Sequence, residues 1–275
     1  MNIGSGAISM TGAGDIDKLT PSNNYIRNNI LYDISCKSAI YGITLGGCGV
    51  TFENNNIGKS MIGGVYMYGN NHTVQYNELY NLMAEASDGA AIYQGRADVF
   101  RGSKAQYNYL HDMVVDNYEI YDGLYNGQCG IYWDDAQSGM NANHNIFKNV
   151  SLAYNSNQAG DCVYSNNTAV DCTYAWKFED NPHKYGVESN TVDTVANGFT
   201  LAQLAELIVY KDLYYDAYEN LEAIVNGTNP KVFNKITYNL SVNSPYQYKN
   251  AAYNLSVIDF STNREAETDD LTTIF

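Results

Sequence analysis

The strongest constraint on this chain is a short motif that recurs along its 275 residues. The motif is an apolar residue, two further residues, an asparagine, and then apolar residues two and five positions later. One copy is Ile26, Asn29, Leu31 and Ile34, and another spans residues 74–82 around Asn77. Other copies, some looser or degenerate, are centred on Asn55, Asn108, Asn145, Asn167, Asn190, Asn239 and Asn254. The first seven asparagines are 26, 22, 31, 37, 22 and 23 residues apart, which indicates a basal unit of about 22 residues with insertions.

A unit this short cannot bury its apolar face alone, and stacking successive units solves that problem. Stacking places each asparagine above the previous one, where side-chain amides can bond to one another and to the turn backbone. Such a ladder is typical of a parallel β-helix. Leucine-rich repeats need several leucines per unit, and a propeller blade is about twice as long. The sequence therefore predicts an all-β, right-handed parallel β-helix.

Each unit also contains a second short strand ahead of its asparagine. We expect these strands at residues 43–45, 65–68, 92–94, 131–134 and 176–179. The last two strands both begin 14 residues before their asparagines. This equal spacing predicts that Tyr132 lies directly beside Lys177. Asp134 then lies directly beside Glu179.

Residues 201–225 interrupt the repeat with apolar residues at helical spacing, and Asn226-Gly227 follows as a stop signal. We interpret this segment as a helical insertion that packs against the coil stack. Residues 1–275 otherwise form one predicted β-helix domain. The chain begins and ends within the repeat pattern, which suggests that it is a fragment of a longer protein.

Charge and composition argue against several functions. The formal net charge is −15, which would repel a phosphate backbone and an anionic membrane surface, so neither nucleic acid nor a membrane is an expected partner. No segment approaches the roughly 20 apolar residues of a membrane span, and no signal peptide is visible.

The five cysteines lack metal-site spacing and are expected to be small buried residues. A disulfide between Cys162 and Cys172 is left open.

The two longest intervals, 31 and 37 residues, are adjacent, so two neighbouring coils carry extra loops. Insertions on one side of a repeat array usually mark its working surface. These coils contain SDGAAIYQGR, from residue 87, and GIYWDDAQSG, from residue 130.

Coils stack at about 4.8 Å, so carboxylates at equivalent positions would be about 5 Å apart on adjacent coils or about 10 Å apart two coils away. Glycoside hydrolysis uses two carboxyl groups about 5–5.5 Å apart for retention or about 6.5–9.5 Å apart for inversion, and both are within reach.

A pair of carboxylates is therefore the expected catalytic centre. Crowding of like charges raises the pKa of one member, which can then stay protonated as a general acid beside an ionised partner. The candidate catalytic residues are Asp88, Asp134, Asp135 and Glu179. The candidate substrate-binding residues are Tyr93, Arg96, Tyr132, Trp133, Lys177, Asp180 and His183. The same aspartates could instead bind Ca²⁺ or cap turns.

The runs SDGAAIYQGR, AQYNYLHDM, GIYWDDAQSG and NHNIFKNV resemble those of bacterial right-handed β-helix proteins in the pectate-lyase-like superfamily. The closest resemblance is to glycoside hydrolase family 141 and its uncharacterised relatives, and it covers nearly the whole chain. It implies a secreted or periplasmic enzyme that cleaves a plant or host polysaccharide. We expect no required cofactor, with Ca²⁺ as a possible one. The family motifs place the catalytic carboxylates at Asp88 and Asp134.

Two other functions stay open. A polysaccharide lyase would hold Ca²⁺ with Asp134, Asp135 and Asp180 against a uronate. Lys177 or an arginine would then remove the proton α to the carboxylate. A non-catalytic module would use the same surface to bind glycan. In every case the expected partner is a polysaccharide or oligosaccharide, and uncapped coil ends also predict self-association.

Overall fold

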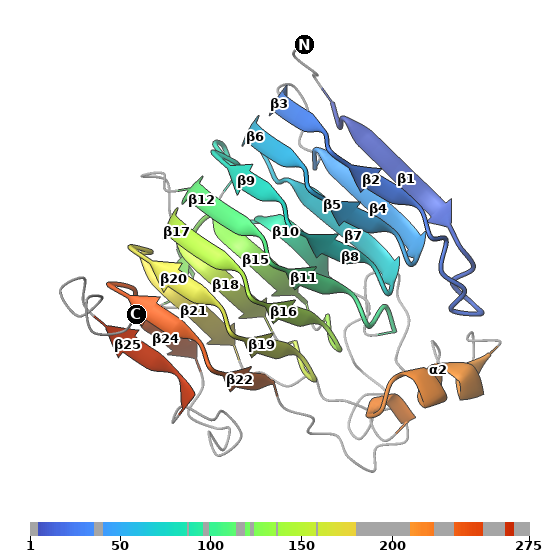
Figure 1. Ribbon diagram of the computed structural model, residues 1–275. Helices are drawn as coiled ribbons and strands as arrows, with labels where there is room; N and C mark the ends of the chain where they lie inside the picture. Colours follow the sequence, from blue (N-terminus) through green and yellow to red (C-terminus); the bar gives the residue numbers. More distant parts are fainter. Residues whose placement is uncertain are drawn as a thin grey trace.

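The computed structural model describes residues 5–35, 41–86, 88–95, 99–113, 119–121, 124–135, 137–157, 159–179, 210–222, 234–249 and 262–266, with only the backbone at 119–126, 179 and 246–249. Within these residues, three all-parallel sheets surround one hydrophobic core, which is the architecture of a parallel β-helix (Figure 1). Strands that follow one another along the chain belong to different sheets, and each sheet pairs strands of successive coils. The predicted all-β parallel β-helix is confirmed.

Each of the first seven coils contributes one strand to each sheet, and the last described coil contributes β24 to sheet 1 and β25 to sheet 3. Sheet 1 contains β1 (Ile8–Ala13), β4 (Ile43–Cys48), β7 (Val65–Asn70), β10 (Ala90–Gly95), β15 (Cys129–Asp134), β18 (Leu152–Asn157), β21 (Tyr174–Glu179) and β24 (Tyr246–Lys249). Sheet 2 contains β2 (Tyr25–Arg27), β5 (Thr51–Glu53), β8 (Thr73–Gln75), β11 (Lys104–Gln106), β16 (Asn141–Asn143), β19 (Val163–Ser165) and β22 (Lys235–Thr237). Sheet 3 contains β3 (Ile30–Ile34), β6 (Asn56–Ser60), β9 (Glu78–Tyr80), β12 (Tyr109–Met113), β17 (Ile146–Val150), β20 (Thr168–Val170), β23 (Leu240–Val242) and β25 (Arg264–Ala266). A short antiparallel hairpin of β13 (Glu119–Tyr121) and β14 (Leu124–Asn126) precedes β15.

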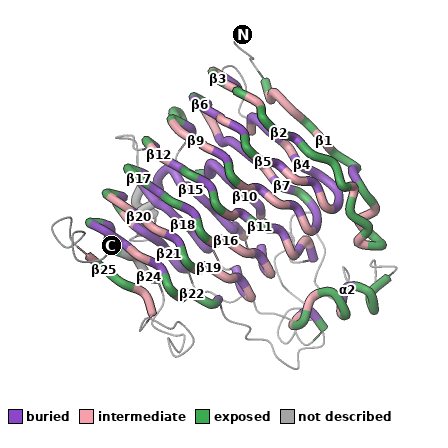
Figure 2. Tube along the Cα trace, viewed as in Figure 1, coloured by how far each residue is buried: buried purple, intermediate pink, exposed green. Residues whose placement is uncertain are grey.

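The core follows from the alternation of side chains along each strand. Ile43, Val65, Ile92 and Ile131 share one register position on four neighbouring strands of sheet 1, and all four are fully buried. Figure 2 shows how buried and exposed positions alternate along the strands. Burial of each such side chain stabilises the fold by about 1.5–3 kcal/mol, and stacking repeats this gain in every coil.

The asparagine ladder lies at the corner between sheets 2 and 3. The backbone N–H and Nδ2 of Asn55 both donate to Oδ1 of Asn77, at 2.9 and 3.0 Å, and Nδ2 also donates to the Ile26 carbonyl at 3.0 Å. The rungs are Asn29, Asn55, Asn77, Asn108, Asn145, Asn167, Asn239 and Asn263. The residue before a rung has a left-handed backbone, as at Asn54 with φ 54°. The ladder thus satisfies the polar backbone of a sharp, buried turn.

The ladder passes directly from Asn167 to Asn239. Oδ1 of Asn239 accepts from the backbone N–H and Nδ2 of Asn167, at 2.9 and 3.0 Å, although the two residues are 72 positions apart. Asn263, and not Asn254, is the rung after Asn239. The prediction that Asn190 is the rung next to Asn167 is therefore wrong, because Asn239 occupies that place. Asn190 and Asn254 lie outside the described residues.

Helix α2 (Lys211–Ala217) lies within the segment 201–225, where the helical spacing predicts a helix. The hydroxyl of Tyr214 donates to the carbonyl of Ile16 at 2.6 Å, so α2 docks against the first coil of the stack. None of the helices in the described ranges is long and apolar enough to cross a membrane.

Loss of one rung should destabilise the whole stack. We expect Asn108→Ala to lower the free energy of unfolding by about 2–5 kcal/mol, because it removes the bonds that Nδ2 donates to Asn145 and to the Val74 carbonyl and takes the acceptor from the backbone N–H of Asn77. Urea unfolding would measure the change. Lys104→Ala, an exposed position of the same coil, is the matched control and should change stability by less than about 0.5 kcal/mol. Equal effects of the two substitutions would contradict a stabilising ladder.

His72 should make the fold sensitive to acid. It is fully buried, its Nδ1 accepts from the Val50 N–H at 3.2 Å, and its Nε2 lies 3.1 Å from the Tyr68 carbonyl. Burial lowers the pKa of the imidazole from 6.5 to about 4. The unfolded chain therefore takes up the proton first as the pH falls, and stability that is complete above about pH 6.5 is lost toward about pH 4. We expect a loss of about 2–3 kcal/mol across this range in urea unfolding. A His72→Gln variant should show a smaller difference between the two pH values, and an unchanged difference would assign the acid sensitivity to other groups.

Candidate functional site

The outer face of sheet 1 carries most of the predicted site residues that the structure describes. One register position on β7 to β21 is occupied by Tyr66, Tyr93, Tyr132, Asn155 and Lys177, which we term the first row. Two residues further along, Gly95, Asp134, Asn157 and Glu179 form the second row. The residues between the rows belong to the core, so both rows face outward. Five consecutive coils therefore contribute to one surface.

Asp134 is held by three hydrogen-bond donors. The Tyr93 hydroxyl donates to Oδ2 at 2.7 Å, whereas Asn157 Nδ2 and the Asp135 backbone N–H each donate to Oδ1 at 2.8 Å. Asn157 Nδ2 also lies 3.4 Å from Oδ1 of Asp135, so a single amide connects the two carboxylates. Asp134 is only 5% exposed. Its carboxylate is therefore fixed in position by its neighbours.

Tyrosine rings fill the surface next to Asp134. The rings of Tyr41, Tyr66 and Tyr93 lie with centroids 5.5–5.8 Å apart, and Tyr132 meets Tyr93 edge-on at 5.5 Å. Burial, and then the charge of Asp134, raises the pKa of the Tyr132 hydroxyl far above its ordinary value. Tyr132 therefore stays a neutral hydrogen-bonding group at any physiological pH.

Three polar or polarizable side chains in or next to the first row are closed off from solvent. Asn155 is fully buried and Lys177 is 3% exposed. Cys129 is fully buried, and burial raises the pKa of its thiol to about 12 against the opposing charge of Lys177. Cys129 also packs with Ala90 in a small apolar cluster that is separate from the main core. A partly polar and partly apolar patch thus lies next to the carboxylates.

The turn that follows Asp134 rests on a polar network. The Gln137 N–H donates to the Asp134 carbonyl at 2.9 Å, and the Gly139 carbonyl accepts from the Gly102 N–H at 2.9 Å. Gly139 has a φ of 68°, and a Cβ there would lie 2.4 Å from Nε of Arg101. Only glycine therefore fits between this turn and the arginine.

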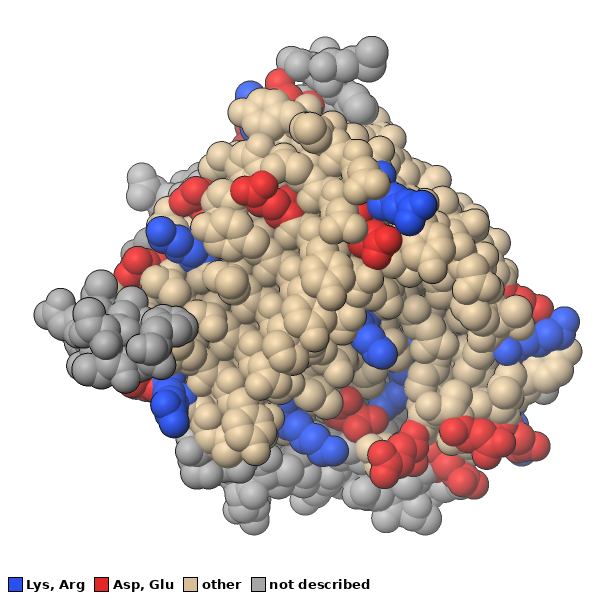
Figure 3. All heavy atoms as spheres, in the orientation of Figure 1, with Lys and Arg blue, Asp and Glu red and all other residues tan. Residues whose placement is uncertain are grey.

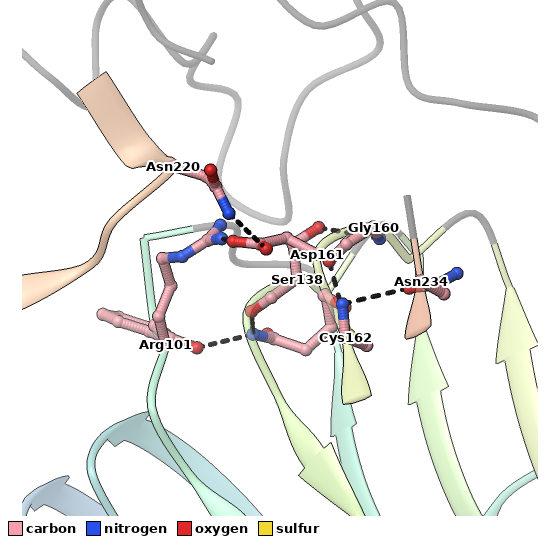
Figure 4. A network of polar contacts seen from close by, with 9 residues as sticks. Arg101, Ser138, Gly160, Asp161, Cys162, Asn220 and Asn234 are labelled. Carbon is pink, nitrogen blue, oxygen red and sulfur yellow. Dashed lines mark hydrogen bonds and ion pairs between the residues drawn. The ribbon is translucent and has the colours of Figure 1, made fainter. Parts of the chain in front are cut away.

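Arg101 is the centre of that network (Figure 4). Its guanidinium is 1% exposed and forms an ion pair with Asp161, whose other oxygen accepts from Asn220 Nδ2 at 2.8 Å. The three residues come from the coil of β10, the turn after β18 and the segment after α2. A buried charge is tolerated only when it is paired, so this network fixes three turns at the end of sheet 1.

The structure brings several predicted residues together. Tyr93, Tyr132, Asp134, Asp135 and Lys177 all lie on or beside the two rows. Asp88 is exposed at the start of β10, and its charge contributes to the raised pKa values of the Cys129 thiol and the Tyr132 hydroxyl. Glu179 falls in the second row, and its side chain is outside the described part. Arg96, Asp180 and His183 also lie outside the described residues.

Two predictions about this surface are wrong. Trp133 is fully buried in the central core and points away from the outer face, because it alternates with Tyr132 and Asp134. Tyr132 and Lys177 share a register position but are not direct neighbours, since Asn155 of β18 lies between them. Asp134 and Glu179 are likewise two strands apart, about 10 Å along the sheet. Cys162 and Cys172 do not form a disulfide with each other.

Asn155 and Asn157 are the site residues that the sequence reasoning missed. They lie on β18 of sheet 1, which is joined to β17 of sheet 3 by a single residue. The other connections from sheet 3 to sheet 1 are longer, so those strands are easier to recognise as separate. A signal was present, because Asn155 lies 23 residues after Tyr132 and 22 before Lys177, which is one repeat unit in each direction. Asn157 stands in the same relation to Asp134 and Glu179.

Acidic side chains gather in Figure 3 in the part of the view where Figure 1 shows α2. The sequence of α2 contains Asp212 and Asp216. No group of three or more potential metal-ligating histidine, cysteine or acidic side chains occurs among the described residues.

Comparison with protein-family models, with curated proteins and with solved structures gave no match for this chain. The chemistry of the site therefore has to be argued from its own geometry.

Loss of the Arg101 partner should destabilise the fold. We expect Asp161→Asn to lower the free energy of unfolding by about 3 kcal/mol, because a buried guanidinium loses the carboxylate that pairs with it. Chemical denaturation would measure the loss. Lys18→Ala breaks an ion pair with Asp15 that is exposed on both sides, and it should leave the free energy of unfolding nearly unchanged. Similar losses in the two variants would show that burial of the Arg101 pair has no special effect.

Proposed function

We propose that this protein is a glycoside hydrolase that cleaves a polysaccharide lying along the outer face of sheet 1. The proposal rests on the environment of Asp134. Its carboxylate accepts hydrogen bonds from three donors and lies next to a cluster of tyrosine rings. Fixed carboxylates and aromatic side chains are the groups that glycoside hydrolysis and sugar binding require. The resemblance to glycoside hydrolase family 141 supports the same assignment, as does a repeat fold that offers one binding position per coil.

Asp134 is the proposed catalytic carboxylate. The family resemblance gives Asp88 as its partner in supplying the acid and the base or nucleophile, and Asp88 lies before β10, at the opposite end of that strand from Gly95, the neighbour of Asp134. Asp134 suits the role of a carboxylate with fixed geometry, because Tyr93 and Asn157 hold its two oxygens. Asp88 is exposed, which allows exchange of protons with water. Asp135 shares the Asn157 amide with Asp134 and would tune it. Glu179 is a second potential partner, because two strands of separation correspond to the spacing of inverting enzymes.

A calcium-dependent polysaccharide lyase is the second candidate. Lys177 favours it, since a lysine buried in the first row could serve as the base that removes a proton from a uronate. That reaction leaves an unsaturated product, whereas hydrolysis does not. A non-catalytic glycan-binding module is the outcome if neither product forms. A polysaccharide substrate fits a secreted or periplasmic location, which we propose with either activity.

The test is a screen of plant and host polysaccharides with the wild type and an Asp134→Asn variant, with and without a calcium chelator. Reducing ends and ultraviolet absorbance would be read together. We expect the wild type to release reducing ends without ultraviolet absorbance, and kcat of the variant to fall by about 10²–10⁴, as removal of an acid or base requires. Asp216→Asn, on the exposed face of α2, is the matched control and should keep full activity. Ultraviolet-absorbing products that need calcium would establish the lyase instead, and binding without either product would establish the non-catalytic module.

A further inference from the structure

Asn155 has a feature that the proposed hydrolysis does not use. Its side chain is fully buried, and neither Oδ1 nor Nδ2 has a hydrogen-bond partner in the structure as described. The Cys129 thiol interacts with the amide, but a thiol is only a weak hydrogen-bonding group. Buried amides without partners are rare in proteins because desolvation of the amide is not compensated. An amide with both functions free is therefore a sign of a missing ligand.

The position of Asn155 supports that interpretation. Asn155 lies in the first row between Tyr132 and Lys177, one strand from Asp134. Buried polar atoms inside the core, such as the Tyr154 hydroxyl, face the lumen of the coil stack, whereas Asn155 alternates with them and faces outward. The β13–β14 hairpin precedes β15 in the chain, and β14 contacts β24, three strands along the sheet from β15. The amide therefore lies on the surface that we propose binds the glycan.

The charges around Asn155 indicate which sugars fit. Lys177 is the one basic residue among the side chains described for sheet 1, whereas Asp88, Asp134 and Asp135 are all close to the rows. Among the side chains that the structure describes at the site, acidic groups therefore outnumber basic ones, in a chain with a net charge of −15. A carboxylate or sulfate on the glycan would meet repulsion there, because like charges in a partly buried site interact strongly. A neutral hydroxyl can donate to Oδ1 and accept from Nδ2 of Asn155.

We propose that Asn155 is a specificity-determining residue that hydrogen-bonds a hydroxyl group of a neutral sugar, and that the site selects uncharged glycans over acidic ones. This inference rests on the proposed function of the same surface. It adds a chemical class of substrate and the residue that recognises it. Asn155 binds and orients the sugar, and Asp134 and Asp88 carry out the bond cleavage.

The experiment compares each acidic polysaccharide of the screen with its carboxyl-reduced, neutral counterpart, together with neutral glycans. The proteins are the wild type, Asn155→Leu and Tyr154→Phe, and the readouts are kcat/KM, glycan binding and thermal stability. We expect the wild type to prefer the neutral member of each pair. Asn155→Leu should lose at least about ten-fold in kcat/KM, since a site built for a hydroxyl needs its hydrogen-bonding group. Its melting temperature should be unchanged or higher, because an unpartnered buried amide has been removed. Tyr154→Phe removes an inward-facing hydroxyl and should keep wild-type kcat/KM.

Each other outcome has a definite meaning. Turnover that favours acidic glycans, or that is equal in the wild type and Asn155→Leu, overturns the inference and leaves the hydrolase standing. A fall in melting temperature with Asn155→Leu shows that Asn155 is a structural residue, which also overturns it. Binding of neutral glycans that depends on Asn155 without any turnover supports the inference and removes the hydrolase. If no glycan is bound or cleaved, both the proposed function and the inference are wrong.

Discussion

The structure depends on the hydrogen bonds by which each ladder asparagine completes the turn of its neighbouring coil. These bonds require one constant geometry at the corner between sheets 2 and 3. Two residues separate the strands at that corner in coil after coil, as between Arg27 and Ile30 or between Gln106 and Tyr109. An insertion there would move the asparagine out of reach of the next rung and leave buried backbone groups unsatisfied. Variation in length is therefore confined to the other two corners.

Those two corners flank sheet 1, which explains why the site lies there. The β13–β14 hairpin enters at the corner between sheets 3 and 1, and Arg101 lies at the corner between sheets 1 and 2. The rigid ladder fixes the register of the strands, and the variable corners supply side chains around them. The Arg101 and Asp161 pair then restrains turns that the ladder does not reach. Rigid strands with loops of variable length are the arrangement in which binding sites are usually found.

The sequence predicts the fold well and the site only in part, for a physical reason. A ladder position must be occupied by asparagine in nearly every coil. The repeat period can therefore be recognised from the sequence alone. A site residue occurs once, and its neighbours depend on how many coils intervene. The spacing of the ladder asparagines does not reveal β18, the strand that carries Asn155 and Asn157. Asn145 and Asn167 are 22 residues apart, which is one repeat unit with no insertion that would draw attention to the strand between them. The orientation of Trp133 was also not readable from spacing, because alternation gives two faces and does not say which is inside.

The first row differs from the apolar residues beside it in a way that stability does not explain. On the same strands, Ala90, Cys129 and Leu152 form an outward-facing apolar cluster, so this part of the sheet can be covered by apolar side chains. Three residues further along, the same strands and β21 carry tyrosines, an amide and an ammonium group, which are costly to desolvate. A lysine and an asparagine closed off from solvent contribute less to folding than leucines of similar size would. Their presence at one register position, next to a carboxylate held by three donors, is what a surface built to bind a polar ligand requires.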